Sequence, residues 1–125
     1  MTIQTDNFHP SYDKKLLCTC GNLLCDKRSV NQSTLNKAQL VRVDANRPLT
    51  VTSGGRCTHH KDESHRTTPA DHQKGIGIDI KVNGGLERAE IVTLGIKHGF
   101  NAIGVGKGFI HLGDRKGHKL VMWVY

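Results

Sequence analysis

The strictest pattern in this sequence is an alternation that runs from Ile76 to Val82, where every second residue is isoleucine or valine. Successive side chains of a β-strand point to opposite faces of a sheet, so the alternation predicts a strand with one apolar face. Asp79 falls on the other face. A sheet with a core on one side is therefore required, and it holds the Asp79 carboxylate on the side away from that core.

Two segments carry apolar residues at intervals of three and four, which is the spacing of an amphipathic helix. The first helix is predicted over residues 29–46, with Ser29 or Ser33 as its N-cap. The second is predicted over residues 86–98, with Gly99 as its C-cap. The predicted apolar faces are Leu35, Ala38, Val41 and Ala45 in the first helix and Leu86, Ala89, Val92 and Ile96 in the second.

Short apolar or β-branched runs predict the remaining strands, at residues 49–52, 101–105, 109–112 and 120–125. Glycine-rich turns separate the last three runs, which predicts hairpin pairing between them. The order of helix, strand, loop, strand, helix and three strands describes an α+β fold with a small, mostly antiparallel sheet. With 125 residues the chain has the length of one domain. We predict that domain over residues 29–125, preceded by a cysteine-containing N-terminal arm, residues 1–28.

The chain is basic, with 18 Lys and Arg against 11 Asp and Glu and a formal net charge of +7. This charge suits nucleic acid, anionic lipid or an anionic cell-wall polymer. The basic residues are dispersed and no aromatic residues alternate with them, so we expect no nucleic-acid partner. No run approaches the ~20 apolar residues of a membrane span, and the start of the sequence does not resemble a secretion signal. We therefore expect no membrane insertion and no signal peptide.

Histidine is abundant, with 8 among 125 residues, and two histidines lie in patterns that suit a metal. His72 precedes the Asp79 strand by a short glycine-containing segment. His111 lies in an alternating run in which Ile110 and Leu112 share the opposite face. If these two strands are neighbours, the two imidazoles and the carboxylate converge on one point. Such a set with an open fourth position is typical of a catalytic zinc (Zn2+) site, where water takes the vacant position.

The segments around these residues resemble the zinc D-Ala-D-Ala carboxypeptidase family. The matching segments are Thr52-Ser53-Gly54-Gly55-Arg56, His72-x-x-Gly75-x-Gly77-x-Asp79-Ile80 and Phe109-Ile110-His111. The family includes bacteriophage endolysins of the L-alanyl-D-glutamate peptidase type, and its fold is shared with the hedgehog signalling domain. The resemblance covers roughly residues 35–125 and implies zinc on His72, Asp79 and His111. It also implies that Arg56 lies beside the metal and holds a substrate carboxylate or carbonyl through its planar guanidinium.

The chain departs from the family pattern at the general base. Many members carry an acidic residue three positions before the last histidine, where this chain has Gly108. Asp114 is the leading substitute, on condition that a bulge at Gly113 turns its side chain back to the face of His111. His118 and Glu87 are the other candidates for the base. Two further departures are Ala70, where the family commonly has serine, and Ile76-Gly77-Ile78, where it often has a pair of small residues.

Two further groups of residues have competing interpretations. The cysteines are Cys18, Cys20, Cys25 and Cys57. Their spacing is not the paired Cys-x-x-Cys of common zinc sites, and partly buried thiols, a structural metal and a disulfide all remain open. A polar loop over residues 56–71 carries His59, His60 and His65 with Asp62 and Glu63, and we interpret it as a solvated loop rather than a second metal site. For Trp123 and Tyr125 we expect packing in the core or at a sheet edge.

Taken together, these features predict a zinc peptidase that hydrolyses a peptide bond in peptidoglycan stem peptides, as a D-Ala-D-Ala carboxypeptidase or an endolysin-type endopeptidase. The positive charge suits an anionic wall. We expect accumulation in the cytoplasm of a phage-infected bacterium, or carriage in a virion, with action at the cell wall. The sequence does not indicate an oligomeric state. The alternatives are a catalytically inactive zinc module that binds a wall peptide or a protein partner, and a phage structural domain.

Overall fold

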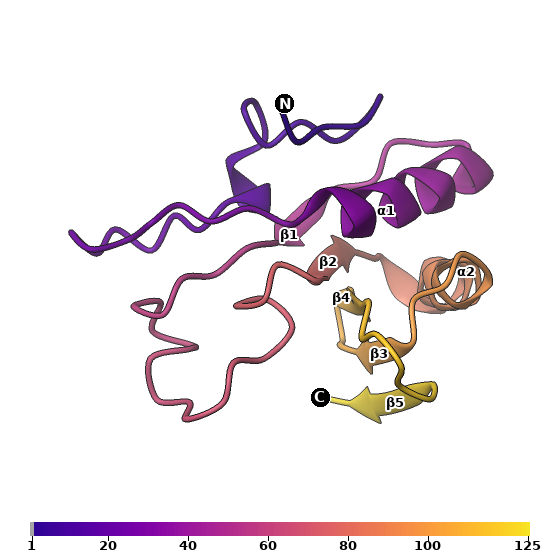
Figure 1. Cartoon of the computed structure of the whole chain (residues 1–125). Coiled ribbons are helices and arrows are strands. Elements are labelled where there is room, and N and C mark those ends of the chain that lie inside the picture. The colour runs from indigo at the N-terminus through magenta and orange to yellow at the C-terminus, as the bar shows by residue number, and fades with distance from the viewer. Residues whose placement is uncertain (1) are drawn as a thin grey trace.

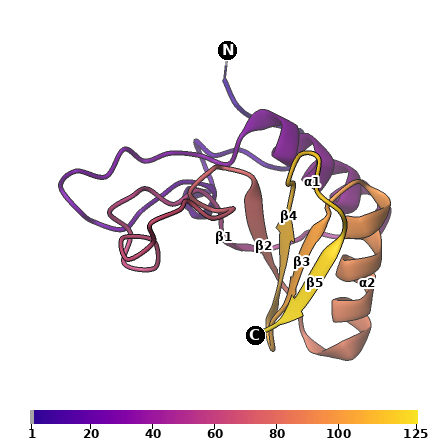
Figure 2. The same cartoon turned by 60° about the horizontal axis from the view of Figure 1, so that its bottom comes forward.

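The structure is a computed structural model, and it describes residues 2–125. Its elements in chain order are η1 Lys14–Leu16, α1 Gln32–Ala45, β1 Val51–Ser53, β2 Gly77–Lys81, α2 Gly84–Lys97, β3 Ala102–Val105, β4 Phe109–Gly113 and β5 Val121–Val124. Figures 1 and 2 show both helices on one side of the sheet and the loop between β1 and β2 on the other. The predicted α+β class is confirmed. Within the described residues, no helix is both long enough and apolar enough to span a membrane.

The sheet has five strands in the order β1-β2-β4-β3-β5. The first three pairings in that order are antiparallel, and β5 pairs with β3 in parallel, so the sheet is mixed. The β3–β4 hairpin forms as predicted, but a hairpin between β4 and β5 does not. The reason is that β2 and β3 already occupy the two edges of β4.

The hydrophobic core lies between the sheet and the helices. Ile78 and Ile80 of β2 pair with Leu112 and Ile110 of β4, and all four side chains are at most 1% exposed. Burying a side chain of this size contributes about 1.5–3 kcal/mol relative to leaving it in water. The apolar alternation that predicted β2 is therefore the core face of the sheet, and the opposite face is free to carry polar groups.

Helix α1 buries the face that its apolar spacing predicted, with Leu35, Ala38 and Val41 in the core. Its N-cap is Asn31 rather than a serine, because the Asn31 side chain accepts a hydrogen bond from the backbone N–H of Thr34 at 2.9 Å. The hydroxyl of Ser29 instead donates to a backbone carbonyl. The helix ends at Asn46, which adopts the left-handed conformation with φ 53°.

Helix α2 buries only part of the predicted face, where Val92 packs against the core. Leu86 and Ile96 are 92% and 37% exposed, whereas Ile91 and Gly95 are buried. The backbone of Gly95 lies against β4, since a Cβ at this position would come within 2.5 Å of Leu112 Cδ2. Close approach of the helix to the strand thus sets the orientation of α2. The spacing of apolar residues does not predict this orientation, because the residue that permits the approach is a glycine.

The N-terminal arm packs into the same core as the rest of the chain. Phe8 and Leu16 are 3% and 0% exposed and belong to the main hydrophobic cluster. Gly55, just after β1, donates its backbone N–H to the carbonyl of Leu16 at 3.1 Å. A Cβ on Gly55 would overlap the carbonyl group of Arg28. Glycine at this position therefore allows the arm to lie directly on the end of β1.

We expect Gly55→Ala to destabilise the fold by about 1–3 kcal/mol, because the added methyl group must displace the backbone of the arm. Thermal unfolding would measure the loss, and limited proteolysis should show earlier cleavage within residues 2–28. Gly108→Ala is the matched control, since a Cβ at Gly108 meets nothing within 4 Å. Equal melting temperatures and equal proteolysis for the two variants would contradict this account of how the arm is held.

Candidate metal centre

His72, Asp79 and His111 come together on the face of the sheet away from the helices. Strands β2 and β4 are neighbours, and Asp79 lies directly opposite His111 in their register. His72 reaches the same point from the turns that precede β2. The Asp79 Oδ1 atom is 2.8 Å from His111 Nδ1 and 3.2 Å from His72 Nε2, and the two nitrogens are 3.2 Å apart. Three donor atoms from separate segments thus face one small space.

The second ring nitrogen of each histidine has its own partner. His72 Nδ1 donates to the carbonyl oxygen of Gly54 at 2.7 Å, and this bond leaves the lone pair of Nε2 facing the centre. His111 Nε2 is 2.8 Å from a carboxylate oxygen of Asp71. With a hydrogen on that nitrogen, the lone pair of His111 Nδ1 faces the centre as well. Both imidazoles are oriented as metal ligands require.

Asp71 is a site residue that the sequence reasoning missed. Its other carboxylate oxygen accepts a hydrogen bond from Arg115 Nε at 2.8 Å, so it connects Arg115 to His111. Burial opposes its charge, but the hydrogen bonds from His111 and Arg115 outweigh burial and lower the pKa of Asp71 to about 2. In the sequence, only its position directly before His72 marks it.

Two glycines make room for these polar groups. Gly77 of β2 and Gly113 of β4 lie opposite each other in the sheet register. A Cβ on Gly113 would come within 2.5 Å of Asp71 Oδ2, and a Cβ on Gly77 would come within 2.8 Å of the His111 ring. At these two positions the sheet has no side chain on the face next to the centre. The Asp71 carboxylate and the His111 ring lie directly against the backbone there.

The charge balance of the centre suits a divalent cation. Burial disfavours charge on both groups, but hydrogen bonds to the two histidines lower the pKa of Asp79, and hydrogen bonds to Asp71 and Asp79 raise the pKa of His111. Among the groups hydrogen-bonded at the centre, the two buried carboxylates of Asp71 and Asp79 thus stand against one permanent cation, Arg115. A metal ion bound by the three donor atoms would take the place of the proton on His111 and compensate the remaining negative charge.

A cavity of about 340 Å³ opens over the centre, and His72, Asp79 and His111 form part of its wall. Trp123 and Tyr125 also line it. The Trp123 ring lies 5.5 Å from the His111 ring, centroid to centroid. Trp123 lies in the edge strand β5 and Tyr125 directly follows it, which agrees with the packing at a sheet edge that we expected. Both residues also form a wall of the cavity. They reach it across Gly104 of β3, which lies between Trp123 and His111 in the sheet register and has no side chain to block them.

Arg56 lines the same cavity. Its Nε atom donates to the hydroxyl of Ser53 at 3.2 Å, which anchors the base of the guanidinium. Among residues 2–125, no protein acceptor bonds its terminal nitrogens. The guanidinium therefore has donors available to a group that enters the cavity.

The structure places Asp114 away from this cavity. The β2–β4 pairing continues in regular register to Gly113, so the predicted bulge is wrong and Asp114 lies on the helix side of the sheet. There its carboxylate forms an ion pair with Lys37 of α1 at 2.8 Å. The other two candidates for the base do not line the cavity either: Glu87 accepts from the backbone N–H of Asn83, and His118 lies in the segment between β4 and β5.

Within residues 2–125, two groups of at least three His, Cys, Asp or Glu bring their ligand atoms within 4.8 Å of one another. One is the centre just described, and the other contains the four cysteines. His59, His60 and His65 belong to neither group. His60 Nδ1 instead accepts from the backbone N–H of Asp62 at 3.0 Å. No protein-family model matches the chain, and no curated protein matches it significantly.

We expect Asp71→Asn to weaken zinc binding at this centre by about 10–100-fold, because the amide holds the His111 ring less firmly and removes one negative charge. Competition with a chromophoric chelator would measure the affinity. Asp62→Asn is the control, since its side chain is 51% exposed and lies outside the centre. Unchanged zinc affinity in the folded Asp71 variant would show that this carboxylate does not orient the ligand.

Proposed function

We propose that this protein is a zinc peptidase that hydrolyses a peptide bond in peptidoglycan stem peptides, on a fold of the hedgehog and DD-peptidase type. The observation that carries the proposal is the convergence of His72, Asp79 and His111, whose donor atoms lie within 4.8 Å of one another in the wall of an open cavity. The order of these residues along the chain, with Arg56 before them, is the order of the family that the sequence resembles.

The donor set favours zinc among the common divalent ions. Two imidazole nitrogens and one carboxylate oxygen suit zinc better than magnesium or calcium, which prefer oxygen ligands. Three protein ligands beside an open cavity leave a position for solvent or substrate. Zinc bound there would polarise a peptide carbonyl and lower the pKa of a water molecule toward ~7.

The rest of the cavity suits a peptide with a free carboxylate. The Arg56 guanidinium lines the cavity and would hold a carboxylate or carbonyl oxygen through two parallel hydrogen bonds. The Trp123 and Tyr125 rings offer an apolar wall for the aliphatic parts of the substrate. The formal net charge of +7 would attract the protein to an anionic wall.

Glu63 is the acid/base residue that we propose in place of Asp114. It lines the cavity, and its side chain is only 1% exposed. One of its oxygens accepts from Arg66 Nε at 2.8 Å, so the carboxylate is held by another residue of the polar loop that also lines the cavity. Asp71 lines the cavity too, but both of its oxygens are engaged by His111 and Arg115. Glu63 would receive a proton from the attacking water and pass it to the leaving amine.

The reaction can be tested with purified cell walls and with defined muropeptides. We expect the zinc-loaded protein to release D-alanine or to cut within the stem, as identified by mass spectrometry of the products. His72→Ala should abolish this activity because it removes a zinc ligand. A chelator should abolish the activity of the unaltered protein, and added zinc should restore it. A protein that binds zinc at this centre yet leaves every muropeptide intact would instead favour the inactive binding module.

For the acid/base role, we expect Glu63→Gln to lower kcat by about 10²–10⁴-fold while zinc binding is retained. Glu90→Gln is the matched control, because Glu90 is also paired with an arginine, Arg47, but lies on the surface of α2. Asp114→Asn should keep nearly full activity and lose stability through its broken pair with Lys37. A loss of activity in a folded Asp114 variant, with Glu63→Gln still active, would restore Asp114 as the base.

A further inference from the structure

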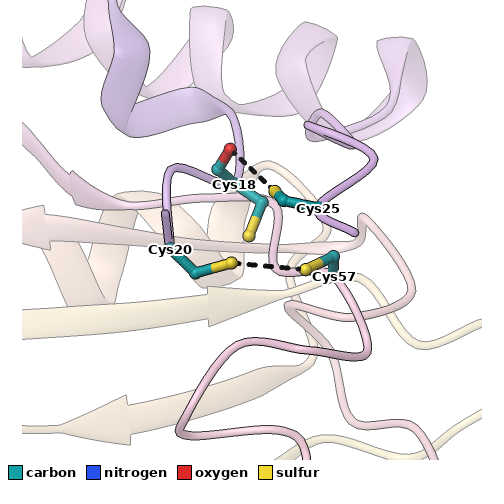
Figure 3. A group of neighbouring side chains, drawn as sticks. All are labelled: Cys18, Cys20, Cys25 and Cys57. Atoms are coloured by element: carbon teal, nitrogen blue, oxygen red, sulfur yellow. Dashed lines mark hydrogen bonds between the residues drawn. The ribbon is translucent and has the colours of Figure 1, made fainter. Parts of the chain in front are cut away.

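The four cysteines come from two distant segments and meet at one point. Cys18, Cys20 and Cys25 belong to the N-terminal arm, and Cys57 follows Arg56 in the segment after β1. Figure 3 shows their side chains gathered between these two parts of the chain. Cys18 and Cys57 are each 1% exposed, and the other two are partly buried. The described chain contains no further cysteine, so the structure brings every thiol of the sequence into this cluster.

The spacing of the sulfur atoms fits a metal ion and does not fit a disulfide. All four Sγ atoms lie within 4.8 Å of one another, and those of Cys20 and Cys57 are 3.6 Å apart. A disulfide needs about 2.05 Å between its sulfurs. Four sulfurs at ~2.3 Å from a tetrahedral zinc ion lie ~3.8 Å from each other, which follows from the geometry of the tetrahedron.

The backbone of the arm is shaped to present these sulfurs. Gly21, directly after Cys20, has φ 79°, and Lys27, two residues after Cys25, has φ 53°. The left-handed conformation at Lys27 is uncommon for a residue with a side chain. Here it accompanies a hydrogen bond from the Lys27 backbone N–H to Cys25 Sγ, at 3.4 Å. A backbone N–H directed at a sulfur stabilises the thiolate form, which is the form that binds metals.

The segment around the cluster has little else to hold it in place. Leu23 and Leu24, between the second and third cysteines, are 101% and 71% exposed, so these two side chains add little apolar burial that would fix the turn. Ordering such a turn costs backbone entropy of about 1–2 kcal/mol per residue. Four bonds to one metal ion, from residues far apart in the sequence, would supply the missing stabilisation.

We propose that Cys18, Cys20, Cys25 and Cys57 bind a structural zinc ion, distinct from the centre at His72, Asp79 and His111. Four thiolates complete the tetrahedral shell of zinc and leave no position for water, so this site has no catalytic chemistry. Its effect is to fasten the N-terminal arm to the segment that carries Arg56.

The test is a count of zinc in the full-length protein, purified under reducing conditions and analysed by mass spectrometry of metals. We expect two equivalents in the unaltered chain, one in His111→Ala, one in Cys20→Ser, and none in the double variant. Thr19→Ser, an exposed position between two of the cysteines, is the matched control and should keep two equivalents. Because His111→Ala isolates the cysteine site, failure of the peptidase proposal leaves this result unaffected.

A second measurement keeps all four cysteines in place, so its result does not depend on whether a cysteine variant folds. Cobalt added to metal-free His111→Ala should give the intense near-ultraviolet absorption of thiolate-to-cobalt charge transfer, and zinc should displace it. Zinc should also protect all four thiols from an aromatic disulfide reagent. The proposal is overturned if His111→Ala binds no zinc, if its thiols react fully in the presence of zinc, or if the reduced protein reforms a disulfide that excludes the metal.

Discussion

The pairing of Asp79 with His111 across β2 and β4 is the interaction on which the rest of this structure depends. A carboxylate that is 6% exposed is stable only with partners, and His111 and His72 supply them. The same register sets Ile78 and Ile80 against the helices. A slip of one residue would turn the isoleucines toward the cavity and the carboxylate toward the core. One strand pairing thus fixes both the hydrophobic core and the candidate centre.

Glycine is as important to the polar face as isoleucine is to the core. Gly77 and Gly113 leave the space that the His111 ring and the Asp71 carboxylate occupy. Gly104 of β3 lies opposite His111, and a Cβ on it would come within 2.8 Å of Trp123 Nε1. The large side chains of Trp123 and Tyr125 can therefore lie close to the backbone of the sheet beside the centre. Glycine in a strand interior lowers the stability of the strand, but here it leaves the space that forms the base of the cavity.

The sequence predicted those features that depend on local periodicity. The alternation around Asp79 located β2, and the spacing of Leu35 and Val41 located the buried face of α1. It failed where a contact with a distant segment decides the outcome: the backbone of Gly95 orients α2, and an ion pair with Lys37 holds Asp114 on the helix side. The convergence of His72, Asp79 and His111 was predictable only on condition that β2 and β4 are neighbours. Asp71 had no periodic signal at all.

The four residues from Gly54 to Cys57 connect the arm to the candidate centre. The Gly54 carbonyl accepts from His72 Nδ1, and the N–H of Arg56 donates to the His72 carbonyl at 3.1 Å. On the other side, the N–H of Gly55 donates to Leu16 and the Cys57 thiol joins the cysteine cluster. This segment has only four residues, and it is hydrogen-bonded both to His72 and to the arm. The arm therefore packs against the segment whose backbone accepts from the His72 ring, and it forms part of the structure that supports this ligand of the centre.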